Sequence, residues 1–124
     1  GKTESTAWDI SHSFKSAKAG DIIHIKAGNY GNKNLIVANS GTSSNPIKFI
    51  GYANQPGDVV SNQGSTFSYG ESVDASKMPL IQGNRTNNEG KGEGIVISNS
   101  FIHIANFQLK YFEMELASYL EGTM

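Results

Sequence analysis

The residues with the clearest chemical potential are histidines and lysines placed within short apolar segments. His24 lies at the centre of an Ile-His-Ile sequence at 23–25, and His103 lies at the centre of the same sequence at 102–104. Side chains alternate between the two faces of a β-strand, so isoleucines that face a core would direct both histidines to solvent. Each histidine is therefore a candidate base or ligand contact, with an ordinary exposed strand position as the alternative interpretation.

Other cationic side chains are spread along the chain. Together with the two histidines, the candidates for contact with an anionic ligand are His24, Lys26, Lys48, Arg85, Lys91, His103 and Lys110. The formal net charge is −1, with Lys and Arg numbering 10 against 11 Asp and Glu, so no surface for nucleic acid or for an anionic membrane is indicated. An anion-binding site would have to be a local cluster on one face of the fold.

Short strands must position these residues. Apolar and β-branched residues recur in segments that Gly, Asn, Ser and Pro separate, with a turn at 27–31. The last segments follow one another so closely that they suit the bends of one parallel coil better than hairpins, and Asn106 at such a bend suits a positive φ. The expected strands are 21–26, 35–37, 47–52, 59–60, 80–81, 95–97, 101–104 and 107–109.

A helix is expected over 5–18, ahead of the first strand. Trp8 and Phe14 belong to a set of apolar residues at partly helical spacing, and Gly20 stands where a C-terminal cap would lie. Such a helix would cover the open end of a stack of strands, because that end exposes apolar side chains and unpaired strand edges. Trp8 and Phe14 are the residues expected to fill the interior there.

Two segments carry a family resemblance. Ala19–Gly31, with the sequence AGDIIHIKAGNYG, and Gly41–Tyr52, with the sequence GTSSNPIKFIGY, resemble strands and turns at the N-terminal end of pectate-lyase-like proteins, especially secreted polysaccharide lyases. The resemblance covers roughly residues 5–112. It implies an all-β fold, a right-handed parallel β-helix of about 2.5 to 3 coils with an N-terminal capping helix.

We expect one domain over 1–124, the N-terminal portion of such a β-helix. Within it, 5–18 forms the capping helix, 21–112 forms the coils, and 113–124 forms either the next strand or a helix that caps the open end. The 14 glycines and the 37% hydrophobic content suit turn-rich β structure rather than a disordered chain. With 0 cysteines, disulfides and thiolate metal sites are excluded.

Two long polar segments, 61–78 and 82–94, interrupt the strands. Long loops often carry function, and Phe67 and Tyr69 in the first segment offer aromatic surfaces on which a sugar could stack. The second segment holds side-chain oxygens that suit Ca²⁺, but their spacing differs from that of the helix-flanked calcium loop, and a solvated turn is the simpler interpretation. These residues are Asn84, Asn87, Asn88, Glu89 and Glu93.

The resemblance also implies a function. It points to the N-terminal part of an extracellular or periplasmic protein, similar to polysaccharide lyases that cleave uronate-containing glycans by β-elimination. In those enzymes a Lys, Arg or His removes the proton next to the carboxylate, which Ca²⁺ or an Arg neutralises. No family site motif matches a position here, so no catalytic or metal-binding residue is assigned, and the chain alone is expected to be inactive. The candidate contacts to an acidic polysaccharide are Lys26, Arg85, His103, Phe67 and Tyr69; no cofactor is evident, and Ca²⁺ is left to a longer parent protein.

Two other interpretations stay open. The chain could be a noncatalytic module that binds glycan, or one that self-associates through the open ends of its β-helix, where backbone groups and apolar side chains lack partners. An antiparallel sandwich is disfavoured, because Asn-Gly and Asp-Gly hairpin turns are scarce between the expected strands.

Overall fold

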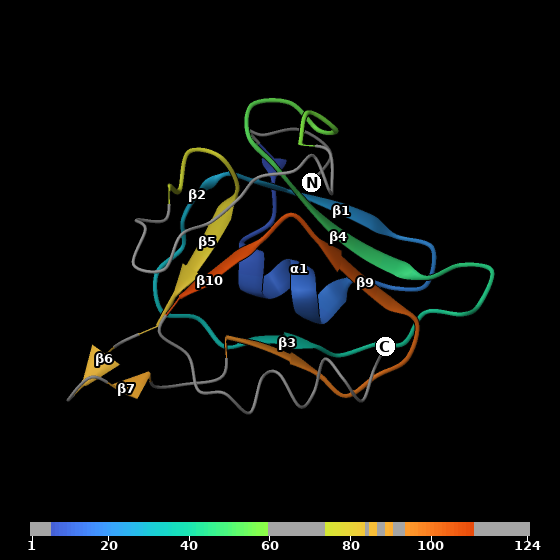
Figure 1. The fold of residues 1–124 in the computed structure, drawn as a ribbon. Coiled ribbons are helices and arrows are strands. Elements are labelled where there is room, and N and C mark those ends of the chain that lie inside the picture. Colours follow the sequence, from blue (N-terminus) through green and yellow to red (C-terminus); the bar gives the residue numbers. More distant parts are fainter. Residues whose placement is uncertain (1–5, 60–73, 84, 87–88, 91–93, 111–124) are drawn as a thin grey trace.

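The computed structural model describes residues 6–59, 74–83, 85–86, 89–90 and 94–110. It is rich in strands and contains one short helix within those ranges (Figure 1). The elements are α1 (Ile10–Ser16), β1 (Ile22–Lys26), β2 (Gly28–Asn29), β3 (Leu35–Val37), β4 (Ile47–Tyr52), β5 (Pro79–Gln82), β6 (Arg85–Thr86), β7 (Glu89–Gly90), β8 (Ile95–Ile97), β9 (Ile102–Ala105) and β10 (Gln108–Lys110).

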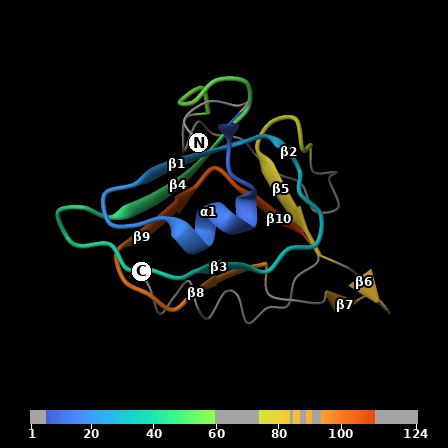
Figure 2. The same ribbon diagram turned by 180° about the vertical axis from the view of Figure 1, so that it is seen from behind.

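Three sheets of parallel strands form the body of the structure. Their strand orders are β1-β4-β9, β10-β5-β2 and β3-β8, and β6 and β7 add a small antiparallel pair. The chain visits the three parallel sheets in one repeating order: β1, β2, β3, then β4, β5, β8, then β9, β10 (Figures 1 and 2). Parallel sheets in this succession are compatible with a parallel β-helix, and they exclude the antiparallel sandwich for the described part of the chain.

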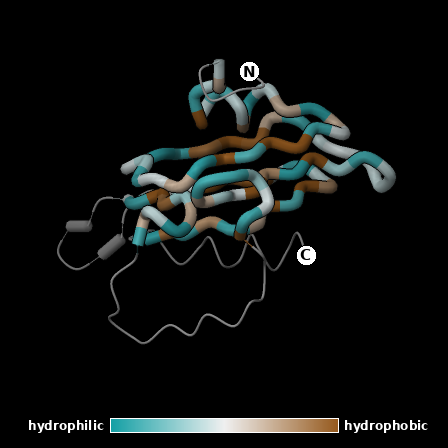
Figure 3. The backbone as a smooth tube through the Cα atoms, turned by 90° about the horizontal axis from the view of Figure 1, so that it is seen from above, coloured by the Kyte–Doolittle hydropathy of each residue, from teal (hydrophilic) through white to brown (hydrophobic). Residues whose placement is uncertain are grey.

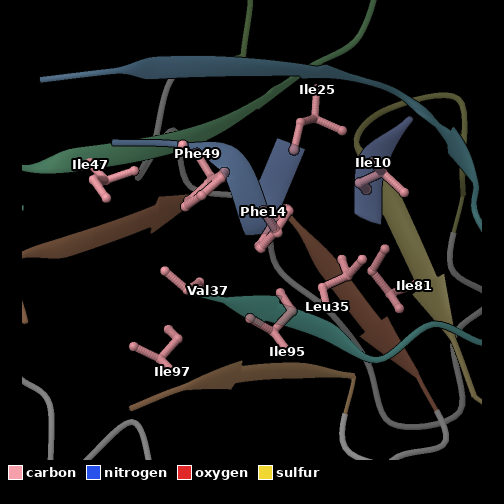
Figure 4. Close-up of a cluster of buried hydrophobic side chains, with 11 residues drawn as sticks. Ile10, Phe14, Ile25, Leu35, Val37, Ile47, Phe49, Ile81, Ile95 and Ile97 are labelled. Carbon is pink, nitrogen blue, oxygen red and sulfur yellow. The ribbon is translucent and has the colours of Figure 1, made fainter. Parts of the chain in front are cut away.

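Stacking in register produces a continuous apolar interior. Ile23 pairs with Phe49, which pairs in turn with Ile104, so each strand adds an apolar side chain to the same inward column. Leu35 and Ile95 form the equivalent column in the β3-β8 sheet, where both are buried. Figure 3 shows the hydrophobic stretches of successive strands running alongside one another, and Figure 4 shows the buried side chains converging between the sheets.

Helix α1 closes one end of this interior. Asp9 caps its N-terminus, where the carboxylate accepts a hydrogen bond from the backbone N–H of His12. The fully buried Phe14 ring stacks on Phe49 at a centroid distance of 4.1 Å and meets Phe107 edge-on at 6.3 Å. Seen end-on, the helix lies within the outline of the three sheets (Figure 1). The expected role of Phe14 is therefore confirmed.

The prediction for Trp8 is wrong, and the helix is shorter than 5–18. Trp8 is 46% exposed and its ring meets that of His12 edge-on, because it precedes the N-cap and so does not share the inward face of the helix. The helix ends at Ser16, and Gly20, with φ 89°, belongs to the turn that leads into β1. The C-terminal carbonyl groups of the helix instead accept hydrogen bonds from the side chain of Asn39.

Two asparagines occupy equivalent bends after the paired strands β3 and β8. Asn39 follows Val37 by two residues and Asn99 follows Ile97 by two residues, and Val37 pairs with Ile97 in the β3-β8 sheet. The Asn99 side-chain amide donates to the Val37 carbonyl at 2.8 Å, while Asn39 satisfies the end of α1. The recurrence of Asn two residues after a strand is therefore a sequence signal for this bend.

Several other expectations need correction. Gly28 and Asn29, expected in a turn, form β2 and pair with β5. Val59, expected to begin a strand, lies in a bend, because the Asp58 carboxylate accepts three backbone N–H groups and holds the preceding residues in a tight turn. The polar segment 82–94 contains the β6-β7 pair. Most of 61–78, including Phe67 and Tyr69, and all of 113–124 lie outside the described residues.

The bend before β10 confirms the expected left-handed asparagine. Asn106 has φ 64°, and its side-chain amide donates to the carbonyl oxygens of Val59 at 3.0 Å and Gly51 at 3.4 Å. A second left-handed residue, Phe101 with φ 59°, lies at the bend before β9 and was not anticipated. Asn tolerates this conformation better than other residues with a β-carbon, so Asn106 both turns the chain and ties this bend to the end of β4 and the segment that follows it.

We predict that Asn106→Ala lowers the free energy of unfolding by about 2 kcal/mol, since it loses these hydrogen bonds and places alanine in the left-handed region. Asn106→Gly loses the same hydrogen bonds without the conformational cost, so its expected loss is about 1 kcal/mol. Urea unfolding of the two variants beside the parent protein measures the difference. Equal losses would contradict a conformational role for this residue.

Candidate functional site

The outward side chains of β1, β4 and β9 form one surface, which we call the cationic face. Burial alternates along β1 and β4, so the outward positions follow directly from the strand period. On these three strands every outward side chain that carries an ionisable nitrogen or carboxyl group is basic. The face consists of Ile22, His24, Lys26, Lys48, Ile50, Tyr52, His103 and Ala105.

Strand register places Lys48 at the centre of one edge of this face. Lys48 pairs with Ile22 of β1 on one side and with His103 of β9 on the other. Neighbouring strands in a sheet lie about 4.8 Å apart, so the Lys48 and His103 side chains leave the sheet side by side. One anionic group placed above them could contact both residues.

The opposite edge of the face combines a cation with aromatic rings. Lys26 pairs with Tyr52, and the His24 and Tyr52 rings lie 6.4 Å apart at an interplanar angle of 71°. The Tyr30 hydroxyl donates to the Lys26 carbonyl oxygen at 2.6 Å. Tyr52 is buried but does not belong to the core cluster, which agrees with its outward position. Because Tyr52 is buried, its ring supports this edge of the face from beneath, and Lys26 and His24 remain the exposed side chains there.

The two ends of the cationic face are too far apart to act on one small group. Lys26 is separated from His103 by four residues along a strand and by two strand spacings, which correspond to roughly 16 Å. The face could therefore engage an extended ligand with several anionic groups along its length.

Among the described residues, two carboxylates flank the cationic face. Asp21 immediately precedes β1, and its side chain accepts the backbone N–H of Lys18 at 2.8 Å. Asp58 follows β4, and the backbone N–H groups of Ala53, Asn54 and Gln55 hold the pKa of its carboxyl below its usual value. Backbone N–H groups thus engage both carboxylates, that of Asp21 in the turn before β1 and that of Asp58 in the turn after β4.

The structure brings some predicted residues together and leaves others apart. Lys26 and His103 share the cationic face, and His24, expected to point outward, lies between them. Arg85 begins β6, in the antiparallel pair outside this sheet. Lys48 was one of the cationic candidates but, like Tyr52, was not among the expected polysaccharide contacts, because only the strand register shows that Lys48 lies beside His103 and that Tyr52 lies beside Lys26.

No group of three or more His, Cys, Asp or Glu side chains that could hold a metal ion occurs among the described residues. Most of the oxygen-bearing residues of 84–93 lie outside that set. In the same part of the chain, no helix has the length and apolar character needed to cross a membrane.

Comparisons with known proteins do not identify a relative. No protein-family model, no curated protein and no solved structure matches the chain. Its function must therefore be argued from its own residues.

The aromatic end of the face supports a prediction about alkaline pH. Partial burial raises the pKa of the Tyr30 phenol, the neighbouring Tyr52 adds to this effect, and Lys26 opposes it. A phenol with a raised pKa stabilises the fold fully below its unfolded value of about 10, and this contribution is lost as the pH rises through the folded value. We expect the parent protein, compared with Tyr30→Phe, to show one additional phenolate transition above pH 10, measured by ultraviolet absorbance. If the absorbance difference between the two proteins instead had its midpoint at or below about pH 10, the pKa of the Tyr30 phenol would not be raised, and the prediction would be wrong.

Proposed function

We propose that this chain is the opening portion of a right-handed parallel β-helix in a secreted, polysaccharide-lyase-like protein, and that its own part is to bind an acidic polysaccharide. The observation that carries the proposal is the cationic face, where His24, Lys26, Lys48 and His103 project from one sheet. Because the formal net charge of the chain is −1, attraction of a polyanion must come from this local cluster.

Three features support the β-helix part of the proposal. The chain passes through three parallel sheets in a repeating order, helix α1 covers one end, and asparagines recur at the bends. These features lie within residues 5–112, the range over which the sequence resembles the opening of pectate-lyase-like proteins. The resemblance supports the architecture, while the reaction of a parent protein is inferred by analogy.

The shape of the cationic face favours a polymer. Its basic groups extend over roughly 16 Å, with an aromatic cluster at one edge and Ile22 and Ile50 among the cations. An acidic polysaccharide offers repeated carboxylate or sulfate groups and apolar ring surfaces along one extended chain. Charge-assisted contacts at Lys48 and Lys26 could hold two such groups of the same molecule.

Binding without cleavage is the expected behaviour of this chain alone. Lys48 and His103 provide nitrogen bases, but His24, Lys26 and His103 are exposed on a face made by three strands. Proton abstraction next to a carboxylate requires a base and a charge-stabilising group held around one carbon atom. A surface this extended orients a polymer rather than surrounding a single reacting centre.

One observation favours self-assembly as a second candidate function. Leu109 is paired with Ile81, which is fully buried in the core, yet Leu109 itself is 38% exposed. Its exposure follows from its place in the last described coil, where β10 pairs only with β5 among the described strands. Ile104 and Phe107 at the same end are also only partly buried. This end could stack against a second copy of the chain.

We predict that Lys48→Gln weakens binding of polygalacturonate or alginate about fivefold at low salt, because it removes a charge close to the bound anion. Lys15→Gln, at an exposed position of α1, serves as the matched control and should leave affinity unchanged. Isothermal titration calorimetry measures the affinity, and ultraviolet absorbance should detect no unsaturated product in the same mixtures.

Equal affinities for parent protein and Lys48→Gln would rule out the cationic face as the binding site. Sedimentation of the same samples separates the two candidates. Monomers that bind the polymer support the first, whereas association between copies, with no polymer binding, supports the second.

A further inference from the structure

We propose that Ile22, Lys48 and Phe101 form a sugar subsite at one edge of the cationic face, where the Phe101 ring stacks on a uronate ring whose carboxylate contacts Lys48. The inference rests on the proposed binding function and states how the polymer is recognised as a sugar. The carrying observation is a juxtaposition: of the large hydrophobic side chains exposed in the described part of the chain, the two most exposed, Ile22 at 53% and Phe101 at 52%, flank Lys48.

Phe101 lies at the entry to β9, on the same edge of the cationic face as Lys48. The next residue, Ile102, pairs with Ile47, and the backbone N–H of Ile47 donates to the Phe101 carbonyl oxygen at 3.0 Å. Ile102 packs against the core whereas Phe101 is exposed, so the Phe101 ring lies on the outer side of the sheet. Strand spacing and rise place the Cα atoms of Phe101 and Lys48 roughly 8 Å apart. On its other side, Lys48 pairs directly with Ile22.

The backbone at Phe101 is unfavourable for the residue that occupies it. Its φ of 59° lies in the left-handed region, which glycine and asparagine adopt more readily than an aromatic residue. Hydrogen bonds hold the bend in place: the Gly41 N–H donates to the Ser100 carbonyl oxygen at 3.0 Å, and the Ser100 N–H donates to Ser40 Oγ at 3.2 Å. At the next bend, Asn106 has a similar φ and is a residue type that suits it.

Neither backbone conformation nor burial therefore explains an aromatic side chain at position 101. Residues kept in a costly backbone conformation often serve a binding site, where the surrounding structure holds them in place. Contact between the exposed Phe101 ring and a ligand would account for the residue type.

A uronate ring matches the groups of this subsite. It presents C–H groups on its face and a carboxylate at its edge, so an aromatic ring can stack on the first while an ammonium group contacts the second. Ile22 offers a further apolar contact beside Lys48. A polyanion without rings can engage Lys48 but has nothing to stack on Phe101. The subsite therefore predicts preference for an acidic polysaccharide over an acidic polypeptide.

Phe101→Asn tests the subsite, because asparagine removes the ring and tolerates the left-handed backbone. Isothermal titration calorimetry at neutral pH and low ionic strength compares polygalacturonate with poly-L-glutamate of matched length, whose carboxylates carry no sugar rings. The variant should bind polygalacturonate about fivefold more weakly than the parent protein, the size of one stacking contact, and should bind polyglutamate equally well. Lys48→Gln should weaken binding of both polymers. Trp8→Ala, which removes an exposed aromatic ring before α1, is the matched control and should leave both affinities unchanged.

Urea unfolding of Phe101→Asn should give a midpoint no lower than that of the parent protein. A lower midpoint would assign the ring to the stability of the fold and overturn the inference. Unchanged polygalacturonate affinity in Phe101→Asn, equal losses for the two polymers, or a matching loss in Trp8→Ala would also overturn it, while the cationic face would remain a binding site. Absence of polygalacturonate binding by the parent protein would overturn both the inference and the proposed function.

Discussion

Strand β4 is the element on which the rest of the structure depends, because it pairs with β1 along one edge and with β9 along the other. This double pairing sets the register of the β1-β4-β9 sheet. It also requires close approach at Gly51, where an added β-carbon would collide with the carbonyl oxygen of Asn106 and lie 2.7 Å from Pro79 Cδ. Glycine allows the bend between β9 and β10 to pack directly on β4.

The same register separates two kinds of chemistry. Inward positions of β4 place Ile47 and Phe49 in a core that Phe14 of the helix completes. Outward positions place Lys48 next to His103 and Tyr52 next to Lys26. Since successive strand residues face opposite sides, a shift of one residue would bury the lysine and expose the phenylalanine. Burial of the core therefore fixes the composition of the cationic face.

Sequence patterns could predict the strands whose core positions repeat most clearly. Alternation predicted β1, β4 and β9 and the outward orientation of His24 and His103, and Asn106 was correctly placed at a left-handed bend. Such predictions succeed because burial and backbone sterics act within a few residues. The pairing of Lys48 with His103 could not be predicted this way, because chain segments of unequal length separate the paired strands.

Other features depend on partners that local patterns do not specify. Strand β2 contains only Gly28 and Asn29 and exists because β5 pairs with it. Trp8 has the apolar character of a core residue, but it precedes the Asp9 cap and remains exposed. The sequence thus predicts the strands better than it predicts how the coils meet.

The most direct test of the cationic face is amide chemical-shift mapping of isotope-labelled protein during titration with an acidic polysaccharide. The account predicts that the largest perturbations fall on Ile22–Lys26, Ile47–Tyr52 and Ile102–Ala105, the strands that form the face. Perturbations concentrated on β3 and β8 instead, or no perturbation at saturating polymer, would contradict it.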